Sequence, residues 1–204
     1  MLNDLKLNKI TMKTLLKILI LFMGFLTASS ANAQHLEFMG IPLNGTIANF
    51  QSKLLKKGCR IMKDNSSYPV GIRGYNGVFA GDKADIFVYY NPKTRIVYQA
   101  RVGIDCDGDK EEAKNMFYKY KDMLYKKYEE VLVEQVTLGS ELNEVENFKY
   151  TLFVYQQPPL QKGSKFLGTI HVCIINQDTY PIFLIEYSDI DNYSKNEKSE
   201  IDDL

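Results

Sequence analysis

Two stretches with the same alternating pattern, far apart in the sequence, constrain most strongly what this chain can fold into. They cover residues 84–104 and 171–187, and a short polar bend interrupts each, N-P-K-T at 91–94 and N-Q-D-T at 176–179. After the first bend, apolar side chains occupy every second position: Ile96, Tyr98, Ala100, Val102 and Ile104. A period of two with one apolar and one polar side is typical of a half-buried antiparallel strand. Each stretch therefore predicts a β-hairpin, and their likeness indicates a duplicated α/β unit.

The pairing across each bend determines which side chains face the core. We expect Tyr90 to pair with Arg95, which places Phe87 and Tyr89 on the buried face. The corresponding pairing in the second hairpin buries Val172. A slip of one residue would turn every side chain to the other face, and the agreement between the two hairpins supports this register.

Two further segments have the spacing of helices that pack one apolar side on a sheet. The first covers residues 46–57 with Thr46 as its N-cap candidate, and the second covers residues 109–130 with Asp109 in that place. Additional strands are expected at 59–62, 78–80, 131–136, 148–156, 167–175 and 181–187. Together these elements predict an α+β fold of two tandem helix-plus-antiparallel-sheet units.

The N-terminus has the features of a targeting segment. Lysines precede an apolar run at 18–28, and A-N-A follows at 31–33, a pattern typical of a cleaved signal peptide. We therefore expect a signal peptide over residues 1–33, with Met1 or Met12 as the start, and a periplasmic or secreted protein without a membrane attachment after cleavage. The remaining chain is divided into a first α/β unit at 34–107, a second at 108–187, and a disordered acidic tail at 188–204.

Charge and cysteine content limit the partners and the covalent bonds. The 25 basic residues are balanced by 25 acidic residues, so nothing in the net charge favours a nucleic-acid partner. The three cysteines, Cys59, Cys106 and Cys173, allow at most one disulfide in an oxidising compartment. A bond between Cys59 and Cys106 stays open, because the separation of their Cα atoms does not follow from the sequence.

The segment F-M-G-I-P-L-N-G at 38–45, followed by a short helix and K-K-G at 56–58, resembles the opening of a group of uncharacterised exported bacterial proteins. Their architecture resembles the β-lactamase-inhibitor-protein-like fold, a tandem repeat of a helical piece and an antiparallel sheet. The motif covers residues 38–58 only, and the rest of the likeness lies in the order of the elements. No inhibitory or catalytic residue is carried over, because no functional motif matches.

One acidic segment invites a metal hypothesis. Asp105, Asp107 and Asp109 alternate as in a calcium loop, but an EF-hand needs glycine at its sixth and glutamate at its twelfth position. Here Gly108 is fourth and Met116 is twelfth. The spacing favours a strand-to-helix turn over a metal site, and a calcium-stabilised structural protein stays as one alternative. We expect no cofactor, since the chain has no recognisable nucleotide loop or paired-cysteine motif.

The function is predicted from one surface rather than from a motif. No known catalytic pattern is present, and His171 is interpreted as a structural histidine with Glu186 as its diagonal neighbour. The sheet face opposite the expected core is rich in apolar side chains, so either it packs within the chain or it docks a protein or peptide. The candidate partner-binding residues are Phe153, Tyr155, His171, Ile182 and Leu184. We expect an exported non-enzymatic binding module, and a small exported enzyme with a site assembled from distant loops is the alternative.

Overall fold

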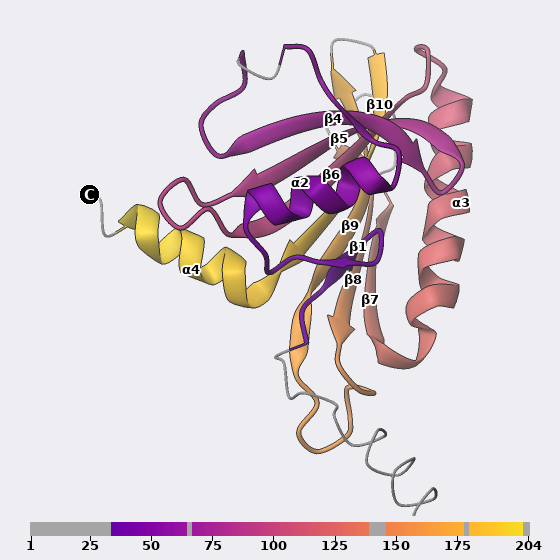
Figure 1. Ribbon diagram of the computed structural model, residues 1–204. Coiled ribbons are helices and arrows are strands. Elements are labelled where there is room, and N and C mark those ends of the chain that lie inside the picture. Colours follow the sequence, from indigo (N-terminus) through magenta and orange to yellow (C-terminus); the bar gives the residue numbers. More distant parts are fainter. Residues whose placement is uncertain (1–33, 65–66, 139–145, 178–179, 202–204) are drawn as a thin grey trace, which may run out of the picture. The chain divides into compact units, whose positions relative to one another are not determined.

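The strand-like segments join into one antiparallel sheet. The computed structural model describes residues 34–64, 67–138, 146–177 and 180–201, and within them eight strands follow the order β3-β4-β5-β6-β10-β9-β8-β7 (Figure 1). They are β3 (Arg60–Ile61), β4 (Ile72–Phe79), β5 (Asp82–Tyr90), β6 (Val97–Asp105), β7 (Leu132–Leu138), β8 (Glu146–Tyr155), β9 (Phe166–Gln177) and β10 (Tyr180–Asp189). A small pair, β1 (Glu37–Phe38) and β2 (Ile41–Pro42), lies apart from this sheet. The signal peptide predicted for residues 1–33 lies outside the described residues.

The helices are α2 (Ile47–Lys56), α3 (Lys110–Tyr128) and α4 (Ile190–Ile201), with a 3₁₀ turn, η2, at Glu129–Val131. The first two confirm the sequence prediction, including their caps. The Thr46 hydroxyl accepts a hydrogen bond from the Asn49 amide, and the Asp109 carboxylate accepts from the amides of residues 111 and 112. These caps satisfy amides that have no partner inside the helix. The fold is therefore α+β.

One face of the sheet, which we call the core face, is buried under α2, α3 and the β1–β2 segment. The α3 side chains Ala113, Phe117, Tyr120 and Leu124 are buried, and the Tyr120 ring lies 5.2 Å from that of Phe183 on β10. On α2, the Gln51 side-chain oxygen accepts a hydrogen bond of 2.8 Å from Arg73 of β4, and the helix crosses in front of β4–β6 (Figure 1).

The register predicted for the first hairpin is wrong. Tyr89 pairs with Gln99 but Tyr90 pairs with Val97, so Tyr98 is an extra residue in a β-bulge. As a result Ile86, Val88 and Tyr90 face the core, while Phe87 and Tyr89 lie half-buried on the opposite face. The bend is longer than predicted because the Asn91 side-chain oxygen accepts hydrogen bonds from the amides of residues 93 and 94 and organises a wider turn.

In the second hairpin the predicted faces are right although the pairing differs. Ile175 pairs with Ile182 instead of Tyr180, a shift of two residues that keeps the same side of each strand inward. Val172 is accordingly buried, opposite Ile185.

The prediction of a disordered acidic tail at 188–204 is wrong for residues 188–201, the part of this segment that the structure describes. Ser188 and Asp189 end β10, and Ile190–Ile201 form α4. Polar contacts hold this helix. The buried Asn192 amide donates a hydrogen bond of 2.7 Å to the Leu43 carbonyl, and Asn196 accepts one of 3.0 Å from Asn91. The hydrophobic pattern did not predict this helix because buried asparagines, rather than apolar side chains, attach it to the rest of the protein.

The two predicted units share one sheet and one core. β6 of the first and β10 of the second lie side by side in antiparallel register, and His35–Leu204 form one compact unit. The Phe79 ring of β4 stacks on Phe38 and Tyr120 at 5.6 and 5.7 Å, and Tyr187 of β10 meets it edge-on at 6.3 Å. A boundary at residues 107–108 therefore separates segments of the sequence but not packed cores.

None of the three cysteines, all of which the structure describes, forms a disulfide. Cys59 and Cys106 are buried, and burial raises the pKa of each thiol. The disulfide that the sequence left open is thus not formed. Among the residues that the structure describes, every helix is too short or too polar to cross a lipid bilayer.

Candidate functional site

The second face of the sheet lies opposite the core face, and the described helices leave most of its area uncovered. We call it the open face. Its side chains are mainly half-exposed rather than buried, among them Phe87, Tyr89, Arg101, Phe153, Tyr155, His171, Cys173, Ile182, Leu184 and Glu186. Among the described helices, α4 alone reaches it, at one end, where Tyr193 packs edge-on against Tyr98 with ring centres 5.7 Å apart. The open face is thus the surface on which to look for a site.

A row of polar side chains crosses the middle of the open face. Arg101 on β6 is paired with Glu186 on β10, Glu186 with His171 on β9, and His171 with Thr151 on β8. The Arg101 Nε donates to the Glu186 carboxylate at 2.9 Å, and the His171 Nδ1 lies 2.9 Å from the Thr151 hydroxyl. The sequence placed Glu186 diagonally from His171, so the direct pairing corrects that expectation.

Electrostatics favour the charged form of Arg101 at the centre of this row. Burial by itself lowers the pKa of Arg101, but the hydrogen bonds and the negative charge of Glu186 outweigh it and raise that pKa overall. The guanidinium also lies over the Tyr89 ring, 5.3 Å from its centre, a cation–π contact that adds to the hold of the ion pair. Burial in turn raises the pKa of Tyr89. The ion pair therefore acts as a fixed ridge across the face.

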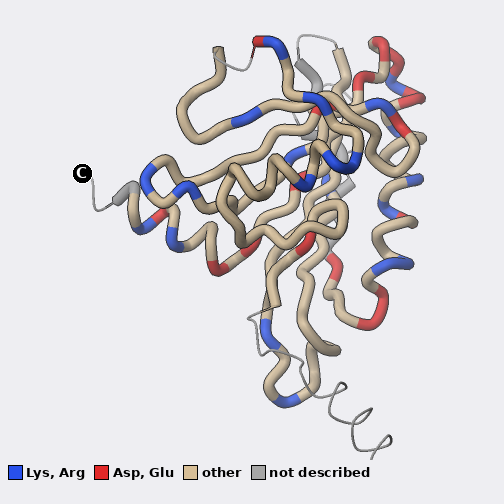
Figure 2. Tube along the Cα trace, viewed as in Figure 1, with Lys and Arg blue, Asp and Glu red and all other residues tan. Residues whose placement is uncertain are grey.

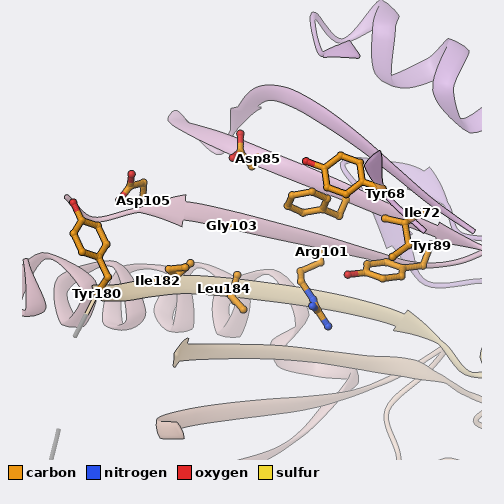
Figure 3. Close-up of a pocket in the computed structure, with 11 residues that line it drawn as sticks. Tyr68, Ile72, Asp85, Tyr89, Arg101, Gly103, Asp105, Tyr180, Ile182 and Leu184 are labelled. Carbon is orange, nitrogen blue, oxygen red and sulfur yellow. The ribbon is translucent and has the colours of Figure 1, made fainter. Parts of the chain in front are cut away.

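On one side of this ridge lies a pocket of about 530 Å³ over β5, β6 and β10 (Figure 3). Its lining consists of Tyr68, Ile72, Asp85, Phe87, Tyr89, Arg101, Gly103, Asp105, Tyr180, Ile182 and Leu184. Gly103 leaves the centre without a side chain, and the strand of Leu184 runs beside it (Figure 3). The volume falls within the range of about 300–1,000 Å³ that is usual for ligand pockets.

A loop before β4 forms one wall of this pocket. The Tyr68 ring packs edge-on against Phe87 at 5.5 Å, and its hydroxyl lies 3.4 Å from the Met62 sulfur. Gly74 allows this approach, since a Cβ there would lie only 2.7 Å from that sulfur. Tyr68 and Met62 can thus pack over β4 because residue 74 has no side chain.

On the other side of the ridge, a smaller pocket of about 280 Å³ lies next to α4. It is lined by Phe166, Gly168, Thr169, His171, Glu186, Ser188, Ile190 and Tyr193. His171 and Glu186, which pair on the adjacent strands β9 and β10, therefore line the same cavity.

The five predicted partner-binding residues all lie on the open face, but not in one cluster. Ile182 and Leu184 line the larger pocket and His171 lines the smaller one. Phe153 and Tyr155 flank Phe166 with ring centres 6.2 and 5.4 Å away.

Sequence reasoning missed the aromatic wall of the larger pocket. Phe87 and Tyr89 were assigned to the core through the wrong register, and Tyr68 lies in a loop without periodicity. Arg101 was a signal that could have been used, because the alternation of β6 already placed it away from the core.

The three aspartates of the metal hypothesis lie in the turn between β6 and α3, where hydrogen bonds to backbone amides involve two of their carboxylates. The Asp105 carboxylate accepts a hydrogen bond of 2.9 Å from the Asp107 amide, and Asp109 caps α3. Within the described part of the chain, no three side chains of His, Cys, Asp or Glu are grouped so that they could hold a metal ion. Figure 2 shows acidic and basic residues interspersed along α3.

No protein-family model matches this chain, and neither a curated protein nor a solved structure is found to be similar to it. The resemblance of residues 38–58 stays a prediction.

Proposed function

We propose that this chain is an exported, non-enzymatic binding module that holds a segment of a partner protein on the open face of its sheet. The observation that carries the proposal is the larger pocket, because it combines aromatic and aliphatic walls with a floor that lacks a side chain at Gly103. Half-exposed aromatic side chains of this kind are enriched where proteins bind one another.

The charges of the pocket indicate what the partner segment carries. Asp85 and Asp105 are exposed on its lining, and among the described residues neither forms an ion pair. Arg101, the one cation among the described lining residues, is already paired with Glu186. We therefore expect a segment in which an apolar or aromatic residue lies next to a lysine or arginine.

We also infer that the two halves of the chain arose by duplication, as the resemblance to the β-lactamase-inhibitor-protein-like fold implies. The element order supports this inference, since α2 precedes β3–β6 just as α3 precedes β7–β10. Their last strands, β6 and β10, are neighbours at the middle of the sheet.

The experiment is affinity capture from the envelope fraction of the producing cells, followed by titration of the purified partner. Leu184→Asp places a charge in the pocket, and Leu160→Asp makes the same change at a fully exposed loop position. We expect the wild type and the Leu160→Asp control to bind the same partner and the Leu184→Asp variant to lose at least about tenfold in affinity. Equal binding by all three proteins, at equal thermal stability, would refute the open face as the site.

The enzyme alternative has one supporting observation, the shared lining of His171 and Glu186 in the smaller pocket. Against it, the Glu186 carboxylate already accepts hydrogen bonds from the Arg101 guanidinium. Incubation separates the two functions. A binding module returns its captured partner intact in a stable complex, whereas an enzyme converts it, and His171→Gln would stop that conversion.

A further inference from the structure

A further pocket lies on the other side of the sheet, away from the open face. It is a pocket of about 360 Å³ between the β1–β2 turn, the end of α2, the β4–β5 turn and the second half of α3. Its lining residues are Met39, Lys57, Phe79, Ala80, Tyr120, Met123, Leu124, Lys127 and Tyr187. Nothing in the proposed protein-binding function uses this pocket.

The walls are apolar and the charges that line them have one sign. Met39, Met123 and Leu124 supply aliphatic surface beside the aromatic rings, and methionine adapts its shape to irregular ligands. Among the described lining residues the charged ones are Lys57 and Lys127, both exposed, with no aspartate or glutamate beside them. Among the described residues neither lysine forms an ion pair.

A buried hydroxyl in the lining also favours a ligand that carries a hydrogen-bond acceptor. Tyr187 is 3% exposed, and its hydroxyl has no hydrogen-bond partner among the residues that the structure describes. The neighbouring hydroxyl of Tyr120 is different, since it lies 2.9 Å from the Phe79 carbonyl oxygen and 2.6 Å from the Asp82 carboxylate. A buried donor without an acceptor is costly and uncommon in folded proteins, and an oxygen of a bound ligand would satisfy it.

From these three observations we propose that the pocket binds a single-chain anionic amphiphile, such as the carboxylate of a medium-chain fatty acid. The apolar chain packs against Met39, Met123 and Leu124. The head group takes the charge of Lys57 and Lys127 and accepts a hydrogen bond from Tyr187. The three groups define a ligand with an anionic oxygen at one end and hydrocarbon at the other.

Calorimetric titration of the full chain with decanoate, below its micelle concentration, tests this site against two probes of the same length. We expect saturable 1:1 binding of decanoate, weaker binding of decanol and none of decyltrimethylammonium. Equal affinity for decanol and decanoate would overturn the role of the lysines. Uptake only by anionic lipid vesicles, without 1:1 binding in solution, would overturn a single-chain site.

Charge-matched variants locate the head group. Lys57→Gln with Lys127→Gln should weaken decanoate binding about threefold to tenfold, as expected for exposed charge pairs. Lys56→Gln with Lys126→Gln removes the same charge from adjacent positions outside the lining and should leave the affinity unchanged. An equal loss in both double variants would refute a local site.

Tyr187→Phe separates binding from folding. Removal of an unpaired buried hydroxyl should leave the melting temperature equal or higher, while the decanoate affinity falls about fivefold through the lost hydrogen bond. An unchanged affinity in a folded variant would overturn the contact with the head group.

Discussion

A single glycine controls how β9 meets the end of β10. Gly168 has a φ of 155°, and a Cβ at this position would lie 2.0 Å from the Ser188 carbonyl oxygen. Gly168→Ala should therefore lower the free energy of unfolding by about 3 kcal/mol or more, because backbone atoms must move. Gly163, at φ 85° with open space around it, is the control; Gly163→Ala should cost about 1 kcal/mol. Urea unfolding measures both, and similar losses would contradict the close approach.

One carboxylate ties the β4–β5 turn to α3 and makes stability depend on pH. Burial alone would raise the pKa of Asp82, but hydrogen bonds from Lys119 and Tyr120, both 2.6 Å, lower it overall. A lowered pKa means that the carboxylate stabilises the fold above its unfolded value of about 4 and loses that effect as the pH falls through the folded value. Asp82→Asn should thus destabilise the protein at pH 7, and the difference should shrink toward pH 3. Thermal unfolding between these pH values checks it, and a constant difference would count against the contact.

At the scale of elements, periodicity predicted α2, α3 and most strands, because each buries one regular apolar side. It failed where polar atoms decide the geometry. The Asn91 turn and the Tyr98 bulge shifted the first hairpin, and α4 was missed because asparagines anchor it. The candidate site inherited these errors: Ile182 and Leu184 were found through alternation, while Phe87 and Tyr89 were lost with the register.

The start of α4 depends on one buried carboxylate. Asp189 is 1% exposed and accepts hydrogen bonds from the amides of Leu36 at 3.1 Å and Asn192 at 3.1 Å, and it lies 2.9 Å from the His35 Nδ1. Asp189→Ala should cost about 2–4 kcal/mol, because a cap is lost and buried amides are left unpaired. Hydrogen exchange should speed up in both α4 and the β1–β2 segment. Asp191→Ala, which removes a half-exposed ion pair with Lys165, should cost less than about 1 kcal/mol.

At the scale of the whole molecule, the aromatic cluster of Phe38, Phe79, Tyr120 and Tyr187 belongs to both halves of the sequence. The halves should therefore unfold together, since neither retains a complete core. We expect one urea transition for residues 34–204, with the same midpoint by circular dichroism and by tyrosine fluorescence. Two separate transitions would instead support independently stable units.

The larger pocket owes its depth to Gly103, whose backbone is compatible with other residues. A Cβ there would meet the nearest atom, in the Leu184 side chain, at 3.5 Å, an ordinary contact distance. Gly103→Val should fill the hollow while leaving the melting temperature equal or higher, because valine suits a strand better than glycine does. Partner retention should then disappear, and its survival would show that the hollow is not used. In this molecule, recognition can be switched off by adding atoms to one strand, so a loss of binding need not be confused with a loss of folding.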